Sequence, residues 1–265
     1  IVGFALVVAL AWAVLRTRLN GSPLPALARA SLVMIGFNWM LHGFWGGEQF
    51  LYSQHWHVPL LVLLAALVSA GELASMMLEL QDMECHNINW VTPTHQVPML
   101  VEALAEARDR GLRAPVVYNC GGYESLEALH LLDGIVDIYM PDAKYGDNRP
   151  GADLSGVPDY WDRCREAVRE MHRQVGDLQI DEAGVATRGL LVRHLVLPEN
   201  LAKTGEVMQF LASLSTDTYV NVMAQYRPEY RAADTPALRR GITSKEYRQA
   251  VEAALRAGLH RLDER

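Results

Sequence analysis

The sequence is poor in cysteine, which excludes several kinds of scaffold. Its 265 residues include three cysteines, Cys85, Cys120 and Cys164, which is too few and too widely spaced for a disulfide framework. The sequence contains no Cys-x-x-Cys pair, so it offers neither a zinc ribbon nor a thioredoxin-type redox motif.

The sequence also lacks an excess of basic residues. Its 24 lysines and arginines are outnumbered by 31 aspartates and glutamates, which gives a net charge of −7. A nucleic-acid-binding protein normally presents a basic surface to phosphates, so we expect no nucleic-acid partner. The 20 glycines and 12 prolines are ordinary in number and argue against collagen-like or disordered classes.

Charge is nearly missing from residues 1–71. Three arginines and one glutamate stand among three apolar stretches, Ile1–Leu15, Ala30–Gly47 and Gln49–Gly71. A membrane-spanning helix needs about 20 mostly apolar residues, so these stretches predict about three membrane helices.

The three arginines lie between the first and second stretches, and the positive-inside tendency places that loop in the cytoplasm. We therefore expect residues 72–265 to be cytoplasmic and anchored in the inner (cytoplasmic) membrane through residues 1–71. The alternative is a helical pair buried in a water-soluble core.

Residues 72–265 form a second region with a different pattern, in which helices alternate with short strands. We predict helices over residues 72–83, 96–110, 125–132, 158–175, 201–214 and 244–257, and strands over 86–91, 115–119, 135–140, 190–197, 218–223 and 259–262, with a polar hairpin over 177–189. Such alternation predicts an α/β fold with a parallel sheet, and six strand–helix steps indicate an open or partial barrel.

Polar side chains follow the predicted strands, where parallel α/β folds gather their chemistry. The candidates are Asn89, Thr92, Asn119, Gly121, Asp142, Lys144, His194 and Gln225. Together they suit a polar, zwitterionic ligand. The alternatives are a simple turn at Gly121 and Gly122, a surface ion pair between Asp142 and Lys144, and structural polar residues at His194 and Gln225.

Five segments carry a family resemblance. They read CHNINWVTPTHQVP, VYNCGGYES, DGIVDIYMPDAKY, GLLVRHLVLPEN and YVNVMAQYRP. In this order they resemble radical S-adenosylmethionine proteins of the pyruvate formate-lyase activating enzyme type, over Glu72 to Asp263. The resemblance implies a partial (βα)6 TIM-like barrel, here without its first βα unit.

The resemblance also implies a chemistry. Such proteins use a [4Fe–4S] cluster to cleave S-adenosylmethionine reductively, and the resulting 5′-deoxyadenosyl radical abstracts hydrogen from a partner, which is a glycyl-radical enzyme or another protein or substrate. By resemblance, Asp142 and Lys144 pair with the methionyl group, and Asn119 lies against the ligand. The segment from Asn89 to Thr94 occupies the place of the family's usual Gly-Gly-Glu triplet, and it reads Thr-Pro-Thr from Thr92. Asn89, Gly121, His194 and Gln225 are further expected contacts.

The sequence departs from the family at the cluster. The family's Cys-x3-Cys-x2-Cys loop is missing, and residues 1–84 contain no cysteine. We therefore expect the chain as written to lack the usual cluster and normal catalysis, and we assign no metal ligand and no catalytic residue. The alternatives are a membrane-tethered, non-catalytic relative that binds a ligand or partner, and a truncated or composite gene product.

Overall fold

The computed structural model describes residues 69–263, and it divides them into two compact units. The smaller unit comprises residues 69–85 and 98–113, and the larger comprises residues 86–97 and 114–263. The apolar stretches predicted to enter a membrane lie outside the described residues, apart from 69–71.

The predicted membrane localisation is wrong for the part of the chain that is described. Between residues 69 and 263, no helix combines the length and the apolar character needed to cross a bilayer. Helix α4 (Ala70–Asp82), which includes the last two residues of the third apolar stretch, has 13 residues and two buried positions, Ala74 and Met77. A bilayer-spanning helix needs about 20 apolar residues.

Local hydrogen bonds define the smaller unit. A capping box between Ser69 and Glu72 starts α4, because each residue accepts a hydrogen bond from the other's backbone N–H. Near the end of α4, the Gln81 amide donates to the Gly111 carbonyl at 3.3 Å and accepts from the Arg113 N–H at 2.6 Å. These bonds fix the loop that follows α5 (Val97–Asp109), which belongs to this unit from Pro98 onward.

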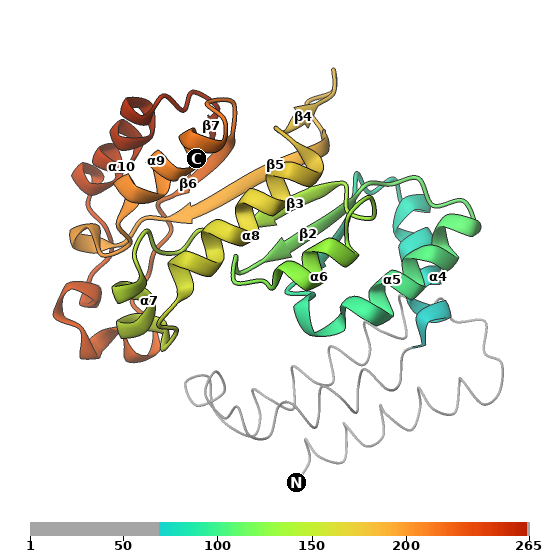
Figure 1. Ribbon diagram of the computed structural model, residues 1–265, viewed down its shortest axis with the longest axis horizontal. Helices are drawn as coiled ribbons and strands as arrows, with labels where there is room; N and C mark the ends of the chain where they lie inside the picture. Colours follow the sequence, from blue (N-terminus) through green and yellow to red (C-terminus); the bar gives the residue numbers. More distant parts are fainter. Residues whose placement is uncertain (1–68, 264–265) are drawn as a thin grey trace, which may run out of the picture. The chain divides into compact units, whose positions relative to one another are not determined.

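The larger unit is built on a seven-stranded sheet (Figure 1). Its main path runs β1-β2-β3-β5-β6-β7, and all neighbours on this path are parallel. A short strand, β4, pairs antiparallel with β5. The strands are β1 (Ile88–Val91), β2 (Val116–Cys120), β3 (Ile138–Pro141), β4 (Gln179–Ile180), β5 (Ala186–Leu195), β6 (Tyr219–Met223) and β7 (Leu262–Asp263).

Helices connect the strands of the main path, since parallel neighbours need a crossover connection. The α-helices of the larger unit are α6 (Leu126–Leu131), α7 (Asn148–Ser155), α8 (Tyr160–Val175), α9 (Thr204–Leu214) and α10 (Ser244–Ala257). Its 3-10 turns are η2 (Thr94–Gln96), η3 (Pro198–Asn200), η4 (Tyr230–Asp234) and η5 (Pro236–Arg239). Helix α8 packs on β3 and β5 and contacts α6, α7 and α9 (Figure 1).

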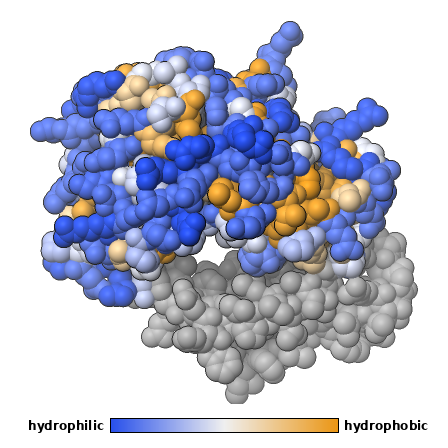
Figure 2. Space-filling view, in the orientation of Figure 1, coloured by the Kyte–Doolittle hydropathy of each residue, from blue (hydrophilic) through white to orange (hydrophobic). Residues whose placement is uncertain are grey.

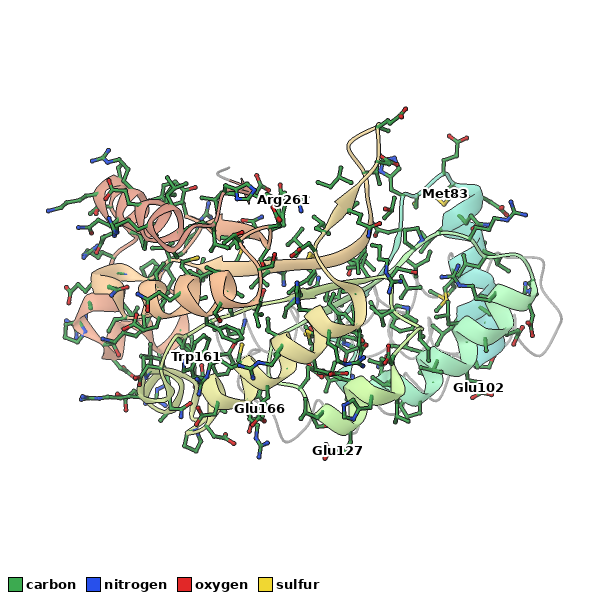
Figure 3. All side chains as sticks on the ribbon, turned by 45° about the horizontal axis from the view of Figure 1, so that its top comes forward. Met83, Glu102, Glu127, Trp161, Glu166 and Arg261 are labelled. Atoms are coloured by element: carbon green, nitrogen blue, oxygen red, sulfur yellow. The ribbon has the colours of Figure 1, made fainter. Side chains whose placement is uncertain are left out.

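Helix α8 has a buried side and a charged side. Cys164, Val168 and Met171 are fully buried. Trp161 meets Phe210 of α9 edge-on, with 5.4 Å between ring centroids, and Figure 3 shows Trp161 and Glu166 on this helix. The surface over α8 is hydrophilic (Figure 2), and it carries ion pairs such as Arg163 with Asp159 and Glu166. The division follows from the helical spacing of its apolar residues.

The structure confirms the predicted α/β fold with a parallel sheet, and it differs in detail. Helix α7 was not predicted, because Pro150 and Gly151 are poor helix formers. Proline is tolerated there because it lies in the first turn, after the Asp147 cap. Strand β5 starts at Ala186, inside the predicted hairpin, since β4 pairs with its first residues.

Candidate functional site

Three neighbouring strands bring polar side chains together where each strand ends. Asp142 directly follows β3 and pairs with Arg193 of β5 across the sheet. The Arg193 guanidinium donates from Nε to Asp142 Oδ1 at 2.7 Å and from Nη2 to Asn119 Oδ1, also at 2.7 Å. Arg193 therefore joins the ends of β2, β3 and β5, at the edge where parallel α/β sheets bind ligands.

A second cation completes this cluster. The Lys144 ammonium donates to Asp142 Oδ2 at 2.7 Å, so both oxygens of the Asp142 carboxylate are engaged. One carboxylate and two cations leave the group of Asp142, Lys144 and Arg193 with a net charge of +1. The Lys144 side chain is 45% exposed, against 20% for Asp142 and 24% for Arg193, so it is the member best able to turn toward a ligand. A carboxylate is the ligand group that this charge favours.

A cavity of about 270 Å³ opens on the cluster. Its lining residues are Asp142, Lys144, Tyr145, Arg193, Leu195, Leu197, Met223 and Gln225. Three of these residues are charged, namely Asp142, Lys144 and Arg193, and three are apolar, namely Leu195, Leu197 and Met223. The cavity therefore suits a small ligand that has an ionic head and an uncharged body.

The floor of the site follows from strand alternation. Val117 pairs with Ile138, and two residues further along Asn119 pairs with Met140. Because side chains alternate between the faces of a strand, all four lie on the same face of the sheet. With Leu178, Val117 and Ile138 form a buried apolar cluster on that face. The polar groups at the strand ends are thus held above a packed apolar base, which limits their freedom to move.

Gly122 allows two loops of the site to approach each other. It has a φ of +78°, and a Cβ at this position would lie 2.4 Å from the Asp142 carbonyl oxygen. Any side chain would therefore clash with backbone and strain the conformation. The close approach of the Asp142 backbone, in addition to the turn, explains why residue 122 is a glycine.

A larger cavity, of about 370 Å³, lies elsewhere, between η3, α9 and α10. Its acidic residue, Glu246, accepts hydrogen bonds from the Arg240 guanidinium and from the backbone N–H groups of Glu199 and Thr243. These bonds, led by the one from Arg240, lower the pKa of Glu246 well below its usual range. The Glu246 carboxylate is thus fully engaged in hydrogen bonds within the protein and has a structural role. For this reason the smaller cavity, of about 270 Å³, is the better candidate site.

The structure places most of the predicted site residues near the cluster. Asn119 contacts Arg193, and Lys144 Cε lies 3.8 Å from the position of a Cβ on Gly121. Gln225 lines the cavity. The Thr92 N–H donates to the Asn119 carbonyl at 2.8 Å, with Thr92 at a φ of +52°. A β-branched residue rarely adopts this conformation, so the bond to Asn119 helps to hold it.

Asn89 and His194 are placed differently. Asn89 is exposed on β1, at the end of the sheet path, and it does not line the cavity. His194 is fully buried on the sheet face opposite to Arg193. Its Nδ1 lies 2.6 Å from the Ala143 carbonyl oxygen and its Nε2 lies 2.9 Å from Thr204 Oγ1, so we assign the proton to Nδ1. Burial lowers the pKa of His194 to about 4, which keeps the ring neutral.

The sequence analysis missed five lining residues, Tyr145, Arg193, Leu195, Leu197 and Met223. Arg193 had a signal in the sequence, because it is the one charged residue in the apolar run from Leu190 to Leu197. Charged side chains are seldom placed in buried strands without a partner. The apolar lining residues gave no such signal, since leucine and methionine in a strand are ordinary core residues.

The three cysteines do not fit the ligand set of an iron–sulfur cluster. Cys85 is exposed, whereas Cys120 and Cys164 are buried. Burial raises the pKa of the Cys120 thiol well above its usual range and that of Cys164 to about 12. Cluster ligands must be thiolates, which such burial disfavours. Within residues 69–263, no group of three or more histidine, cysteine or acidic side chains is arranged to hold a metal ion.

No protein-family model matches the chain, and comparisons with curated proteins and with solved structures find similar proteins. The uncharacterized protein MJ0674 of Methanocaldococcus jannaschii is 34% identical over 171 residues, which make up 63% of this chain and 46% of that protein. The chain therefore spans less than half the length of this relative. A domain of a pyruvate-formate lyase-activating enzyme from Bacteroides vulgatus has a TM-score of 0.47 and 15% identity, over 67% of this chain and 97% of that domain.

Proposed function

We propose that the larger unit binds S-adenosylmethionine, as a partial barrel of the radical S-adenosylmethionine type. The observation that carries the proposal is the cluster of Asp142, Lys144 and Arg193 at the strand ends, within bonding distance of one another. The order of the five sequence motifs that resemble this family also supports it. Both features fall in the same segments, VDIYMPDAKY and GLLVRHLVLP.

The residues present suit the ligand. An amino-acid head carries a carboxylate and an ammonium, and the cluster offers Lys144 and Arg193 to the first and Asp142 to the second. Leu195, Leu197 and Met223 line the rest of the cavity and suit the uncharged part of the ligand. At about 270 Å³, the cavity takes the head and only part of the body, so the remainder would extend out of it.

Catalysis is a separate matter, and we assign the chain no radical step. The exposed thiol and two buried thiols do not fit a cluster. The protein partner predicted from the resemblance, a glycyl-radical enzyme or another protein, stays a prediction. Because the chain spans under half the length of its relative, the activity of the whole protein stays a proposal too.

The buried thiols favour a ligand-binding domain that performs no radical chemistry over an active radical enzyme. Anaerobic reconstitution with iron and sulfide distinguishes these two forms of the proposed function. The non-catalytic form predicts no stoichiometric cluster absorption and no reductive cleavage of S-adenosylmethionine. A cluster that forms and cleaves the sulfonium would establish the radical enzyme in its place.

Equilibrium binding tests the proposed function itself. Titration calorimetry with S-adenosylmethionine is expected to show one site in the wild-type chain. Lys144→Gln removes the exposed cation of the cluster and is expected to weaken binding about tenfold or more, as loss of a charged hydrogen bond predicts. The matched control is Lys245→Gln, since Lys245 is also exposed and lies on α10, outside the cavity. Absence of binding, or equal affinity in both variants, would refute the proposal.

A further inference from the structure

The backbone of Asp142, Ala143 and Lys144 is held by hydrogen bonds from three directions. The Asp142 N–H donates to the Cys120 carbonyl and the Ala143 N–H donates to the Arg193 carbonyl, both at 2.9 Å. The Ala143 carbonyl accepts from Nδ1 of His194 at 2.6 Å. Residues of the neighbouring strands β2 and β5 thus provide the hydrogen-bond partners of this backbone on two sides.

On the third side, the hydrogen bonds come from one hydroxyl group, that of Tyr160 at the start of α8. It accepts the Lys144 N–H at 2.9 Å. Its proton is shared between the carbonyl oxygens of Asp142, at 2.7 Å, and Gly121, at 2.9 Å. A single side-chain atom therefore bridges the loop after β2 and the loop after β3, which carry the cluster and Gly121.

The surroundings of Tyr160 keep its hydroxyl in place. The residue is 3% exposed, Tyr123 stacks on its ring with 6.2 Å between centroids, and Tyr145 meets it edge-on at 5.4 Å. Gly151 lies so close that a Cβ there would be 2.7 Å from Tyr160 Cβ. Burial raises the pKa of Tyr160 beyond its usual range, so the phenol retains the proton that it donates.

We propose that Tyr160 is a positioning residue of the ligand site, which fixes the Asp142 and Lys144 side chains by holding the backbone between them. It touches no ligand and acts through those two residues. The role rests on the proposed function, because it is defined by the amino-acid head of the ligand. It goes beyond that function by assigning the preorganisation of the site to a residue outside the cavity lining.

Hydrogen exchange of the ligand-free chain tests the backbone part of this proposal. Tyr160→Phe removes only the hydroxyl, and Tyr139→Phe is the matched control, since Tyr139 is equally buried and its hydroxyl donates to Gln174 at 2.7 Å. We expect the Lys144 amide to exchange about tenfold faster or more in Tyr160→Phe, and at the wild-type rate in Tyr139→Phe. Unchanged exchange in Tyr160→Phe, or equal acceleration in both variants, would overturn the proposal.

Ligand selectivity tests the link to the site. S-adenosylhomocysteine carries the amino-acid head, whereas 5′-methylthioadenosine lacks it. Tyr160→Phe is expected to weaken the first about tenfold and the second less than about twofold, while Tyr139→Phe leaves both unchanged. An equal loss for both ligands would show a merely structural role. If the wild-type chain binds neither ligand, the proposed function fails, and the exchange experiment still decides whether Tyr160 holds the backbone.

Discussion

Arg193 and His194 are neighbours on β5, and they show how differently the two faces of the sheet use polar residues. On one face, Arg193 is partly exposed and bonds to side chains at the ends of two other strands. On the other, His194 is fully buried, neutral, and bonded to Ala143 and Thr204. One face presents charge to a cavity, and the other ties the sheet to the loop after β3 and to the first residue of α9.

The same contrast holds along both faces. Tyr118 and Tyr139 lie on the face of His194, and their buried hydroxyls donate to Glu124 at 3.1 Å and to Gln174 at 2.7 Å. These buried polar groups are hydrogen-bonded within the protein, as structural groups normally are. The cavity face instead carries more positive than negative charge in its cluster. A polar residue after a strand therefore indicates a ligand site only when its side chain lies on the cavity face.

The largest expected effect comes from removing His194. His194→Ala leaves a cavity and two buried groups, the Ala143 carbonyl and the Thr204 hydroxyl, without their partner. We expect a loss of about 4 kcal/mol in the free energy of unfolding, from cavity formation and unsatisfied hydrogen bonds. Urea denaturation measures it, and a loss below about 1 kcal/mol would contradict the structural role.

The pH dependence of stability is the next largest effect. The pKa of His194 falls from 6.5 to about 4 on folding, so between these values the unfolded chain binds the proton and the folded chain does not. Stability therefore rises with pH across this interval, and acidification from pH 6.5 to pH 4 is expected to cost about 3 kcal/mol from this group.

His194→Gln provides the control for this prediction, because it removes the titrating ring and keeps an amide that can hydrogen-bond. The difference between wild-type and variant stability, measured by urea denaturation at several pH values, should change across the interval. If the two proteins lose stability in parallel, the ring is not held neutral by burial.

A smaller effect on stability is expected from Arg193→Met. The change removes the bonds to Asp142 and Asn119 and is expected to cost about 2 kcal/mol, since the guanidinium is only partly buried. The loss in the free energy of binding S-adenosylmethionine should exceed the loss in the free energy of unfolding. If the Arg193→Met variant is destabilised but binds S-adenosylmethionine with wild-type affinity, Arg193 has a structural role like that of His194. The contrast between the two faces would then be wrong.

The smallest effect concerns an ion pair outside both faces. Arg149 and Asp153 on α7 are 3.5 Å apart, with side chains that are 87% and 63% exposed. Exposed pairs contribute little, so Arg149→Ala should shift the thermal midpoint by less than about 1 °C. A larger shift, recorded in the same melting experiment as the other variants, would show that charge matters away from the site.

Much of the fold was predictable from the sequence, and the reason is periodicity. Helix α10 coincides with its predicted range, because a Thr243–Glu246 capping box starts it and Gly258 ends it. Helix α7 was not predicted, because Pro150 and Gly151 mask its signal. The apolar lining of the cavity depends on which distant strands meet, and local pattern does not contain that information.

The candidate site was predictable in part. Asp142 and Lys144 are two residues apart, and their pairing follows from the chain itself. Arg193 and Asn119 join them only through the register of β2, β3 and β5, because the bonded partners are 51 and 74 positions apart in the sequence. His194 illustrates the converse, because a one-residue step along a strand moves a side chain to the other face.

The central claim is that the amino-acid head of a ligand binds among Asp142, Lys144 and Arg193. Amide chemical shifts of the isotope-labelled chain, followed during titration with S-adenosylhomocysteine, test it most directly. The account predicts the largest changes at residues 119–122, 142–145 and 193–197, with smaller changes at 223–225. Changes centred on α10, or none at saturating ligand, would contradict it.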